Sequence, residues 1–423
     1  MFKFIHTADI HLDSPLHNLD LYEGAPVEEF RQATRRAFEN LIHLAISEKV
    51  AFVLIAGDLY DGDWKDYNTG LYLVSQMTKL RDAGIPVFIV AGNHDAASRI
   101  TKKLRLPDNV TLFHPKKPST FCLEKLNVAI HGQSFPSPSV KTDLSRDYPE
   151  ALKGYFNIGL LHSCATGREG HEPYAPCSLD GLCSKGYDYW ALGHVHRHEV
   201  LLEDPFVLFS GNTQGRHIRE TGPKGCVLVS VNHSGRSEIE FKPIDVVRWE
   251  ILVVDADGFE SGYDIVDSFS HKLEQLLDEN EGMPTAVRII IEGETPAHDD
   301  ILSDVERWTN EFRAAALEIG AGKVWVEKAK FNITEPTSDI FPEQASGAIS
   351  ELLNLFDELG NDADARRALA SELAEIEKKL PIELKSGSDE IQFDDTDWIG
   401  DLLKQAKPML IKRLLKKGAP NED

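Results

Sequence analysis

The chain has 423 residues, more than one compact core usually holds, so two or three domains are expected. Its 42% hydrophobic and 27% charged residues are typical of a globular protein, and no apolar run approaches the ~20 residues of a membrane helix. The net charge of −24 argues at first against nucleic acid. However, residues 1–250 carry 27 Lys and Arg against 31 Asp and Glu, and residues 251–423 carry 18 against 38. Charge therefore neither excludes nor supports DNA binding.

The N-terminus and the cysteines predict a cytoplasmic protein. His6, Asp9 and His11 interrupt the first residues, which do not read as a signal peptide. The five cysteines form no CxxC pair and no disulfide framework, as expected in a reducing compartment.

Residues 1–245 alternate apolar runs of strand length with helical patterns. Helical spacing of apolar residues predicts helices within Val27–Lys49 and Gly70–Ala83. The strand-like segments are Phe2–Thr7, Ala51–Ala56, Pro86–Ala91, Lys125–His131, Phe156–Leu161, Tyr187–Leu192, Glu199–Phe209, Gly225–Val231 and Ser237–Pro243. This order predicts an α/β (α+β) fold, in which two sheets, one of them partly parallel, form a β-sandwich with helices outside.

Residues 247–335 predict a small α/β domain, which ends before Pro336. Its expected strands are Trp249–Val254, Ala286–Glu292 and Lys323–Phe331, and its expected helices are Tyr263–Leu277 and Asp299–Ile319. Residues 336–423 predict a helical C-terminal region with helices at Ala345–Glu358, Asp364–Lys379 and Trp398–Lys417. The last helix has a leucine stripe among six basic residues, which favours an acidic helical partner over intramolecular packing or a membrane surface.

Metal-competent side chains follow five of the predicted strands: Asp9, His11, Asp58, Asn93, His94, His162, His194 and His196. Strands of one sheet that end in such groups bring them to one edge, where oxygen and imidazole donors suit two divalent cations. In an extended segment, Asp-x-His and His-x-His would each point both side chains to one side. Taken alone, each motif also fits a turn or a satisfied polar residue. Their joint occurrence in chain order favours a metal site.

These segments resemble the calcineurin-like metallophosphoesterase superfamily, whose pattern is D-x-H, G-D-x-x-D, G-N-H-D/E, H and G-H-x-H. Within it, the residues in and around these motifs are most similar to those of the DNA-repair exonuclease branch of SbcD- and YhaO-like proteins. The segments that carry the resemblance are FIHTADIHLDSPL (4–16), AGDLYDG (56–62), VAGNHD (90–95), GLLHS (159–163), GYDYWALGHVHRHEVL (186–201) and SGNTQGRHIRE (210–220).

The resemblance implies a site with two divalent metal ions bridged by Asp58. It implies that one metal is held by Asp9, His11, Asp58 and His196. It implies that the other is held by Asp58, Asn93, His162 and His194. Manganese is the expected metal, since zinc more often takes a tetrahedral set, and iron is the alternative. His94 would contact the scissile phosphate and help to protonate the leaving oxygen.

Two further groups of residues are candidate substrate contacts. Arg216, His217 and Arg219 follow GNTQG in a loop that is expected near the site, where they could hold phosphates, although a solvated basic loop fits equally well. Arg168, His171 and Tyr174 lie in a Gly/Pro-rich insertion that is expected to line the substrate entrance.

The function that the resemblance implies is a metal-dependent DNA nuclease in DNA repair. It would be a 3′–5′ exonuclease, with endonuclease activity as a further option, and it would work with a coiled-coil ABC-type ATPase of the SbcC or YhaN kind. Residues 247–335 would then form a capping domain, the C-terminal region would engage the ATPase, and a homodimer is expected. One alternative is a phosphodiesterase or phosphatase for a non-DNA phosphoester, since the metal ions would contact the phosphate and not the group esterified to it. The other is a non-catalytic DNA- or partner-binding scaffold.

Overall fold

The computed structural model describes residues 1–14, 30, 32–61, 67–97, 105–165, 174–336, 348–377, 399–400, 402–403 and 406. Contacts divide the chain into two compact units. The first comprises residues 1–250, 277–287 and 320–327, and the second comprises 251–276, 288–319 and 328–423. The predicted domain boundaries near residues 245 and 335 stay predictions. No helix in the described part of the chain is both long and apolar enough to cross a bilayer.

The first sheet has six strands in the order β12-β11-β1-β2-β3-β4. Their bounds are β1 Phe2–Thr7, β2 Phe52–Ala56, β3 Val87–Val90, β4 Val110–Leu112, β11 Gly225–Val231 and β12 Ser237–Pro243. Strands β1 to β4 pair in parallel, whereas β11 and β12 are antiparallel to their neighbours. In the parallel part, Thr7 lies opposite Ile55 and Ala56 lies opposite Val90, so the strands end together at one edge.

The second sheet also has six strands, in the order β5-β6-β7-β8-β10-β9. Their bounds are β5 Ser119–Leu123, β6 Val128–Gly132, β7 Phe156–His162, β8 Tyr189–Gly193, β9 Glu199–Glu203 and β10 Phe206–Phe209. The four inner strands are parallel, and the edge strands β5 and β9 are antiparallel. His162 lies opposite Gly193, so β7 and β8 also end side by side.

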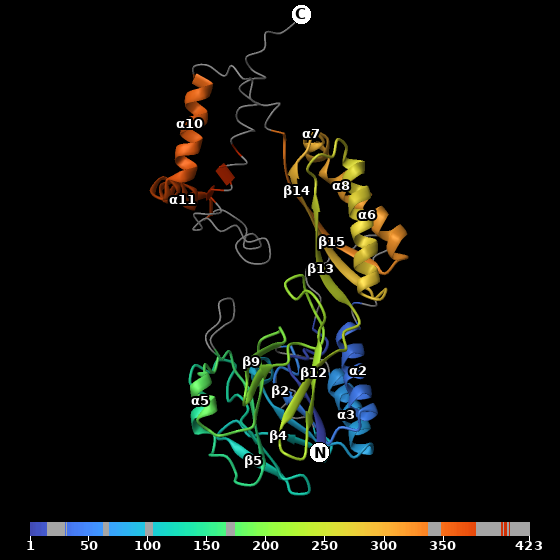
Figure 1. The fold of residues 1–423 in the computed structure, drawn as a ribbon, viewed down its shortest axis with the longest axis vertical. Helices are drawn as coiled ribbons and strands as arrows, with labels where there is room; N and C mark the ends of the chain where they lie inside the picture. The colour runs from blue at the N-terminus through green and yellow to red at the C-terminus, as the bar shows by residue number, and fades with distance from the viewer. Residues whose placement is uncertain are drawn as a thin grey trace, which may run out of the picture. The chain divides into compact units, whose positions relative to one another are not determined.

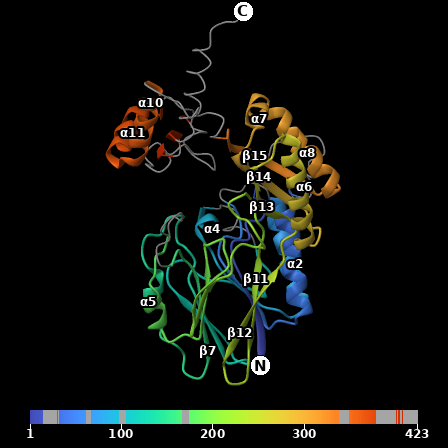
Figure 2. The ribbon, with the colours of Figure 1, turned by 45° about the horizontal axis from the view of Figure 1, so that its top comes forward.

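The two sheets pack face to face between helices (Figures 1 and 2). The space between the sheets is filled by large side chains such as Phe4, Phe52 and Tyr189, all fully buried. Helices α2 (Ala33–Ser47) and α3 (Tyr67–Asp82) cover the first sheet, and α5 (Leu179–Cys183) lies on the second. The predicted two-sheet sandwich with flanking helices is therefore confirmed.

A third sheet of three strands has the order β13-β14-β15. Its strands are β13 Arg248–Asp255, β14 Thr285–Glu294 and β15 Val324–Thr334. The segments between these strands form helices α6 (Gly262–Glu279), α7 (His298–Ser303) and α8 (Val305–Gly320). Phe269 of α6 packs against Phe312 of α8, with ring centroids 5.3 Å apart. Two later helices, α10 (Ala348–Asn361) and α11 (Ala363–Glu377), contact each other, with α11 at one end of α10 in Figure 1.

Several predicted elements differ from the structure. The segment Glu199–Phe209 is not one strand, because a turn at Asp204–Pro205 folds it into the β9–β10 hairpin. The helix expected at Asp299–Ile319 is interrupted at Asp304, which has φ −146° and accepts a hydrogen bond from Arg307 N, capping α8. Strands β4 and β5 were not predicted, since β4 has only 3 residues and β5 is largely exposed.

Some of the predicted helices extend beyond the residues that the structure describes. Within Val27–Lys49 the helix α2 begins at Ala33, and most of the segment before it lies outside the described residues. Of Trp398–Lys417, only 399–400, 402–403 and 406 are described. The partner-binding helix therefore stays a prediction.

Candidate metal centre

The candidate ligands all follow the carboxyl ends of parallel strands. Asp9 and His11 come after β1, Asp58 comes after β2, and Asn93 begins α4 (Asn93–Ala97) after β3. The second sheet contributes His162 as the last residue of β7, with His194 and His196 after β8. Because the two sheets end at a common edge, side chains separated by up to 187 positions in the sequence reach one place.

Four of these residues adopt the left-handed backbone conformation that non-glycine residues rarely enter. Their φ angles are 50° at Asp9, 45° at His11, 50° at Asp58 and 103° at His194. Such conformations cost on the order of 1–3 kcal/mol each and cluster at functional sites. Hydrogen bonds hold the two loops together, since Asp9 N donates to Gly57 O and His11 N donates to Asp58 O, both at 3.0 Å.

These angles correct the expected geometry of Asp-x-His and His-x-His. Neither motif continues as an extended segment, because the chain turns at Asp9, His11 and His194. The imidazoles of His194 and His196 consequently belong to different clusters. His194 joins Asp58 and His162, whereas His196 joins the two groups after β1.

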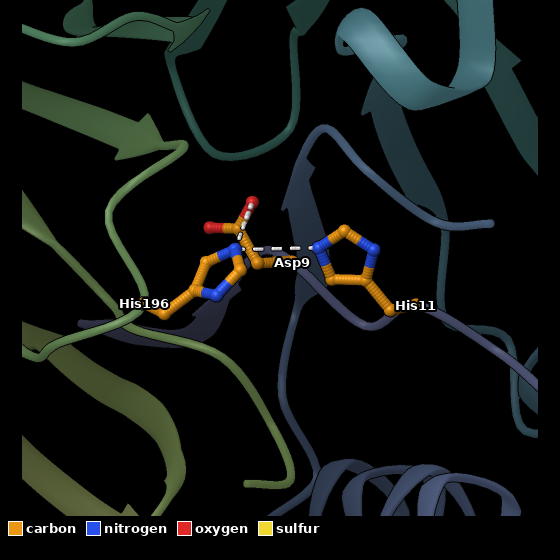
Figure 3. Close-up of side chains that lie close together, drawn as sticks. All are labelled: Asp9, His11 and His196. Atoms are coloured by element: carbon orange, nitrogen blue, oxygen red, sulfur yellow. Dashed lines mark hydrogen bonds and ion pairs between the residues drawn. The ribbon is translucent and has the colours of Figure 1, made fainter. Parts of the chain in front are cut away.

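The first cluster consists of Asp9, His11 and His196 (Figure 3). Nε2 of His11 lies 3.3 Å from Nε2 of His196, which lies 3.9 Å from Oδ1 of Asp9. That carboxylate oxygen is buried and has no hydrogen-bond partner among the described residues. A buried acceptor facing two imidazole nitrogens costs free energy unless a cation satisfies it, so this donor set fits a metal ion.

The second cluster consists of Asp58, His162 and His194, all buried. Nε2 of His162 lies 3.5 Å from Oδ2 of Asp58 and 3.0 Å from Oδ1 of Asn93. Nδ1 of His162 lies 2.9 Å from Ala56 O and would donate to that carbonyl. Such a bond leaves the Nε2 lone pair facing the carboxylate and the amide oxygen, which is the arrangement of a metal-binding histidine.

Burial disfavours the charged form of four cluster residues, Asp9, His11, Asp58 and His162. It raises the pKa of Asp58 to about 6, and together with the nearby Asp58 charge it raises the pKa of Asp9 well above its usual range. Burial lowers the pKa of His162 to about 3, and burial and Arg216 lower the pKa of His11. The imidazoles of His11 and His162 are therefore held neutral beside the buried carboxylates of Asp9 and Asp58, a donor set that would suit two divalent cations.

His94 lies beside the clusters with its side chain 38% exposed. Its Nδ1 is 3.1 Å from Oδ1 of Asp61, and this hydrogen bond raises the pKa of His94. Burial alone would raise the pKa of Asp61, but His11 at 3.6 Å and the closer contacts with His94 and Ser14 lower it far below its usual range. Asp61 was not among the predicted site residues, although it occupies the last position of the G-D-x-x-D pattern.

Asp95, which is buried, is a second carboxylate that was not among the predicted site residues. It accepts hydrogen bonds from the backbone N–H groups of Leu59, Tyr60 and Gly92 at 3.0–3.1 Å. These bonds tie the loop that carries Asp58 to the loop that carries Asn93. The last position of G-N-H-D is the sequence signal that could have found it.

The predicted substrate contacts Arg216, His217 and Arg219 lie in the loop 210–224. The side chain of Arg216 is 13% exposed and lies among carboxylates, 3.3 Å from Glu220 and 3.5 Å from Asp61. His217 is half exposed and also contacts Glu220, and Arg219 is exposed. Of the insertion residues, Tyr174 packs its ring 5.7 Å from that of His194. Arg168 and His171 lie outside the described residues.

Glu220 is a third residue beside the clusters that was not among the predicted site residues. It is 5% exposed, and its Oε1 lies 2.6 Å from Nδ1 of His196. Burial alone would raise the pKa of Glu220, but the hydrogen bond and charge of His196 and the charge of Arg216 lower it well below its usual range.

Two parts of the chain match known protein families. Residues 2–198 match the profile of calcineurin-like phosphoesterases, and residues 249–334 match the middle domain of metallophosphoesterase YhaO. The chain is 35% identical over 300 residues to the uncharacterized metallophosphoesterase YhaO of Bacillus subtilis, covering 69% of this chain and 72% of the relative. Every candidate ligand lies within the residues 2–198 that match the first profile.

More distant relatives carry the name DNA double-strand break repair protein Mre11. The one from Sulfurisphaera tokodaii is 24% identical, covering 73% of this chain and 78% of that protein. The one from Sulfolobus acidocaldarius is 26% identical, covering 71% and 77%.

Proposed function

We propose that this chain, which belongs to the calcineurin-like metallophosphoesterase family, is a two-metal DNA nuclease. Membership of the family implies phosphoester hydrolysis with divalent metal ions. The observation that carries the proposal is the pair of Asp/His clusters at one sheet edge, with His94 beside them. The similarity to proteins named for DNA double-strand break repair supports DNA as the substrate.

In the proposed site, one metal ion is held by Asp9, His11, Asp58 and His196. The other is held by Asp58, Asn93, His162 and His194. When bound, two such ions neutralise charge on a phosphate oxygen and acidify a water molecule. Mixed oxygen and imidazole donors favour manganese over zinc, which more often takes a tetrahedral set.

The chain's own residues supply positioning and a proton. The backbone N–H of His94 donates to Oδ1 of Asp58 at 3.0 Å, which restrains the carboxylate within the second cluster. Asp61 holds Nδ1 of His94, so Nε2 is the atom left to face solvent and substrate. The hydrogen bond to Asp61 raises the pKa of His94, which suits the ring to give a proton to the leaving oxygen of the phosphodiester.

We further propose that residues 247–335 act as a capping domain and that a coiled-coil ABC-type ATPase is the partner in the cytoplasm. The match of residues 249–334 to the middle domain of YhaO supports an accessory domain at this place in the chain. The basic, leucine-striped segment Trp398–Lys417 suits an acidic helical partner. Co-purification from the native cell, with and without residues 398–417, tests this: an ATPase that is retained without the segment would overturn its role.

The nuclease proposal is tested by offering the purified protein three substrates with Mn²⁺: linear duplex or hairpin DNA, a bis-aryl phosphate and a phosphopeptide. We expect cleavage of DNA and its loss in Asp58→Ala. Hydrolysis of the bis-aryl phosphate or phosphopeptide with DNA left intact would replace the nuclease with a phosphodiesterase or phosphatase. DNA processing that survives Asp58→Ala would show that the proposed centre is not the active site.

A further inference from the structure

We infer that Glu220 and Arg216 are positioning residues that fix the orientation of both a candidate metal ligand, His196, and the candidate proton donor, His94. This inference rests on the proposed function, because it assigns roles around the same centre. Neither residue is an expected ligand, and Glu220 lies beyond the strand-end motifs, 24 positions after His196.

The carboxylate of Glu220 is held on both oxygens. Oε1 lies 2.6 Å from Nδ1 of His196, and Oε2 accepts hydrogen bonds from Asn212 Nδ2 at 2.9 Å and Arg216 N at 2.8 Å. The group therefore cannot turn away without breaking several bonds. With Nδ1 of His196 donating to Glu220, only Nε2 keeps a lone pair, and Nε2 is the atom that faces His11 in the first cluster.

Arg216 joins this pair to the pair that orients His94. One end of its guanidinium lies 3.3 Å from Oε1 of Glu220, and the other lies 3.5 Å from Oδ2 of Asp61 and 3.3 Å from Oγ of Ser14. Oδ1 of the same Asp61 holds Nδ1 of His94. A planar cation of fixed shape thus sets the spacing of two carboxylates, each of which holds one histidine.

The loop that carries these residues is itself anchored. The side chain of Gln214 donates to Val247 O at 2.7 Å and accepts from Val246 N at 2.9 Å. Trp249 Nε1 donates to Gly215 O at 2.9 Å, next to Arg216. A β-carbon at Gly215 would press on Glu220 O and the Trp249 ring, so the backbone has little freedom to shift. The loop is therefore a rigid support for Glu220 and Arg216.

Positioning and phosphate binding make different predictions for Arg216. A phosphate contact would raise KM when it is removed and leave the metals untouched. A positioning role would weaken metal binding and lower kcat with KM nearly unchanged. The guanidinium is only 13% exposed and already engaged by two carboxylates, which favours positioning.

The experiment measures Mn²⁺ binding by calorimetry and by electron paramagnetic resonance, together with kcat and KM on a bis-aryl phosphate. The variants are Glu220→Ala, Glu220→Gln, Arg216→Met and Arg216→Lys. Controls are Glu203→Ala and Arg236→Met, which alter exposed residues of the same types in the same unit. Circular dichroism and thermal unfolding of every variant report the fold.

We expect Glu220→Ala to weaken one of two Mn²⁺ sites by about 10–100-fold and to reduce the signal of the coupled metal pair. Glu220→Gln, whose amide oxygen can still accept from Nδ1, should recover part of that loss, and it serves as the test if Glu220→Ala does not fold. Arg216→Met should lower both Mn²⁺ affinity and kcat, with KM changed less than threefold.

Two results would overturn the inference: wild-type Mn²⁺ affinity in both Glu220 variants, or a rise in KM alone in Arg216→Met. Absence of Mn²⁺ binding by the unaltered protein would overturn it as well. A failure of the nuclease proposal alone would give a different set of results. The unaltered protein would then bind two Mn²⁺ ions and leave DNA intact, while the Glu220 variants would still lose affinity.

Discussion

Gly92 leaves the space that the Asp58 carboxylate occupies. A β-carbon built at Gly92 would overlap Oδ1 of Asp58 and would lie 2.9 Å from both its Cγ and its backbone nitrogen. Glycine is thus required here by a close approach between the loops after β2 and β3. The proposed bridging ligand owes its position to a residue that has no side chain.

Gly92→Ala should therefore displace Asp58 and weaken Mn²⁺ binding at both sites. We expect a loss of about 1–3 kcal/mol in the free energy of unfolding, as for other overpacked positions. The matched control is Gly360→Ala in α10, where a β-carbon meets nothing within 4 Å and alanine favours the helix by up to about 1 kcal/mol. Calorimetry measures the Mn²⁺ affinity of each variant, and urea unfolding measures its free energy of unfolding. Wild-type Mn²⁺ affinity in Gly92→Ala would contradict the bridging role.

Asp58→Asn should have opposite effects on the metal-free and metal-bound protein. Burial raises the pKa of Asp58 to about 6, so at pH 7.5 the folded protein holds an ionised carboxylate in an unfavourable place. An amide removes that cost and should stabilise the EDTA-treated protein by about 1–3 kcal/mol. The same variant should lose the stabilisation by Mn²⁺ and most phosphoesterase activity. Thermal unfolding with EDTA and with Mn²⁺ measures both, and a destabilised metal-free variant would speak against this account.

The positions of the candidate ligands could be predicted because local sequence patterns encode them. Buried parallel strands are continuous apolar runs, and a polar residue directly after such a run must lie at the sheet edge. This reasoning located Asp9, Asp58 and His162 without any structure. It failed on the direction of the side chains, because nothing in the residue types at Asp9 or His194 announces a left-handed backbone.

The supporting residues could not be predicted in the same way. Glu220 meets His196 across 24 positions and Asp61 meets His94 across 33, and neither pair has a periodic pattern. Such contacts depend on how two loops fold over the sheet edge. For the same reason the residue types around Arg216 fitted a phosphate contact or a solvated basic loop and did not reveal that its guanidinium lies between two carboxylates.

His94→Gln should separate catalysis from metal binding. His94 lies with His11 and Asp61 in a third group of possible metal donors, but it is outside the two sets proposed to hold the metal ions. Mn²⁺ stoichiometry and affinity should therefore stay within about twofold of the wild type. Loss of a positioned general acid should lower kcat by about 10²–10⁴-fold. His114→Gln, at an exposed position, is the control and should keep full activity. If His94→Gln bound fewer Mn²⁺ ions, His94 would have to be counted among the ligands.

The last prediction concerns His6, which is fully buried beneath the site. Its Nδ1 lies 3.0 Å from the Tyr189 hydroxyl and its Nε2 lies 3.1 Å from Leu192 O. Burial lowers the pKa of His6 from 6.5 to about 3, so the folded protein keeps the ring neutral. An unfolded chain takes up a proton below pH 6.5. The stability that His6 contributes is therefore complete above pH 6.5 and is lost as the pH falls toward 3, by about 1.4 kcal/mol per unit.

Urea unfolding of the EDTA-treated protein at pH 7.5 and pH 5.5 tests this dependence. His6→Gln should be less stable than the wild type at pH 7.5, because it loses buried packing and hydrogen bonds. Between the two pH values that deficit should shrink by about 1.4 kcal/mol, since the variant has no imidazole to protonate on unfolding. Buried His11 and His162 titrate in both proteins, so their effects cancel in the comparison. A deficit that stays constant would mean that His6 is protonated in the folded state at pH 5.5.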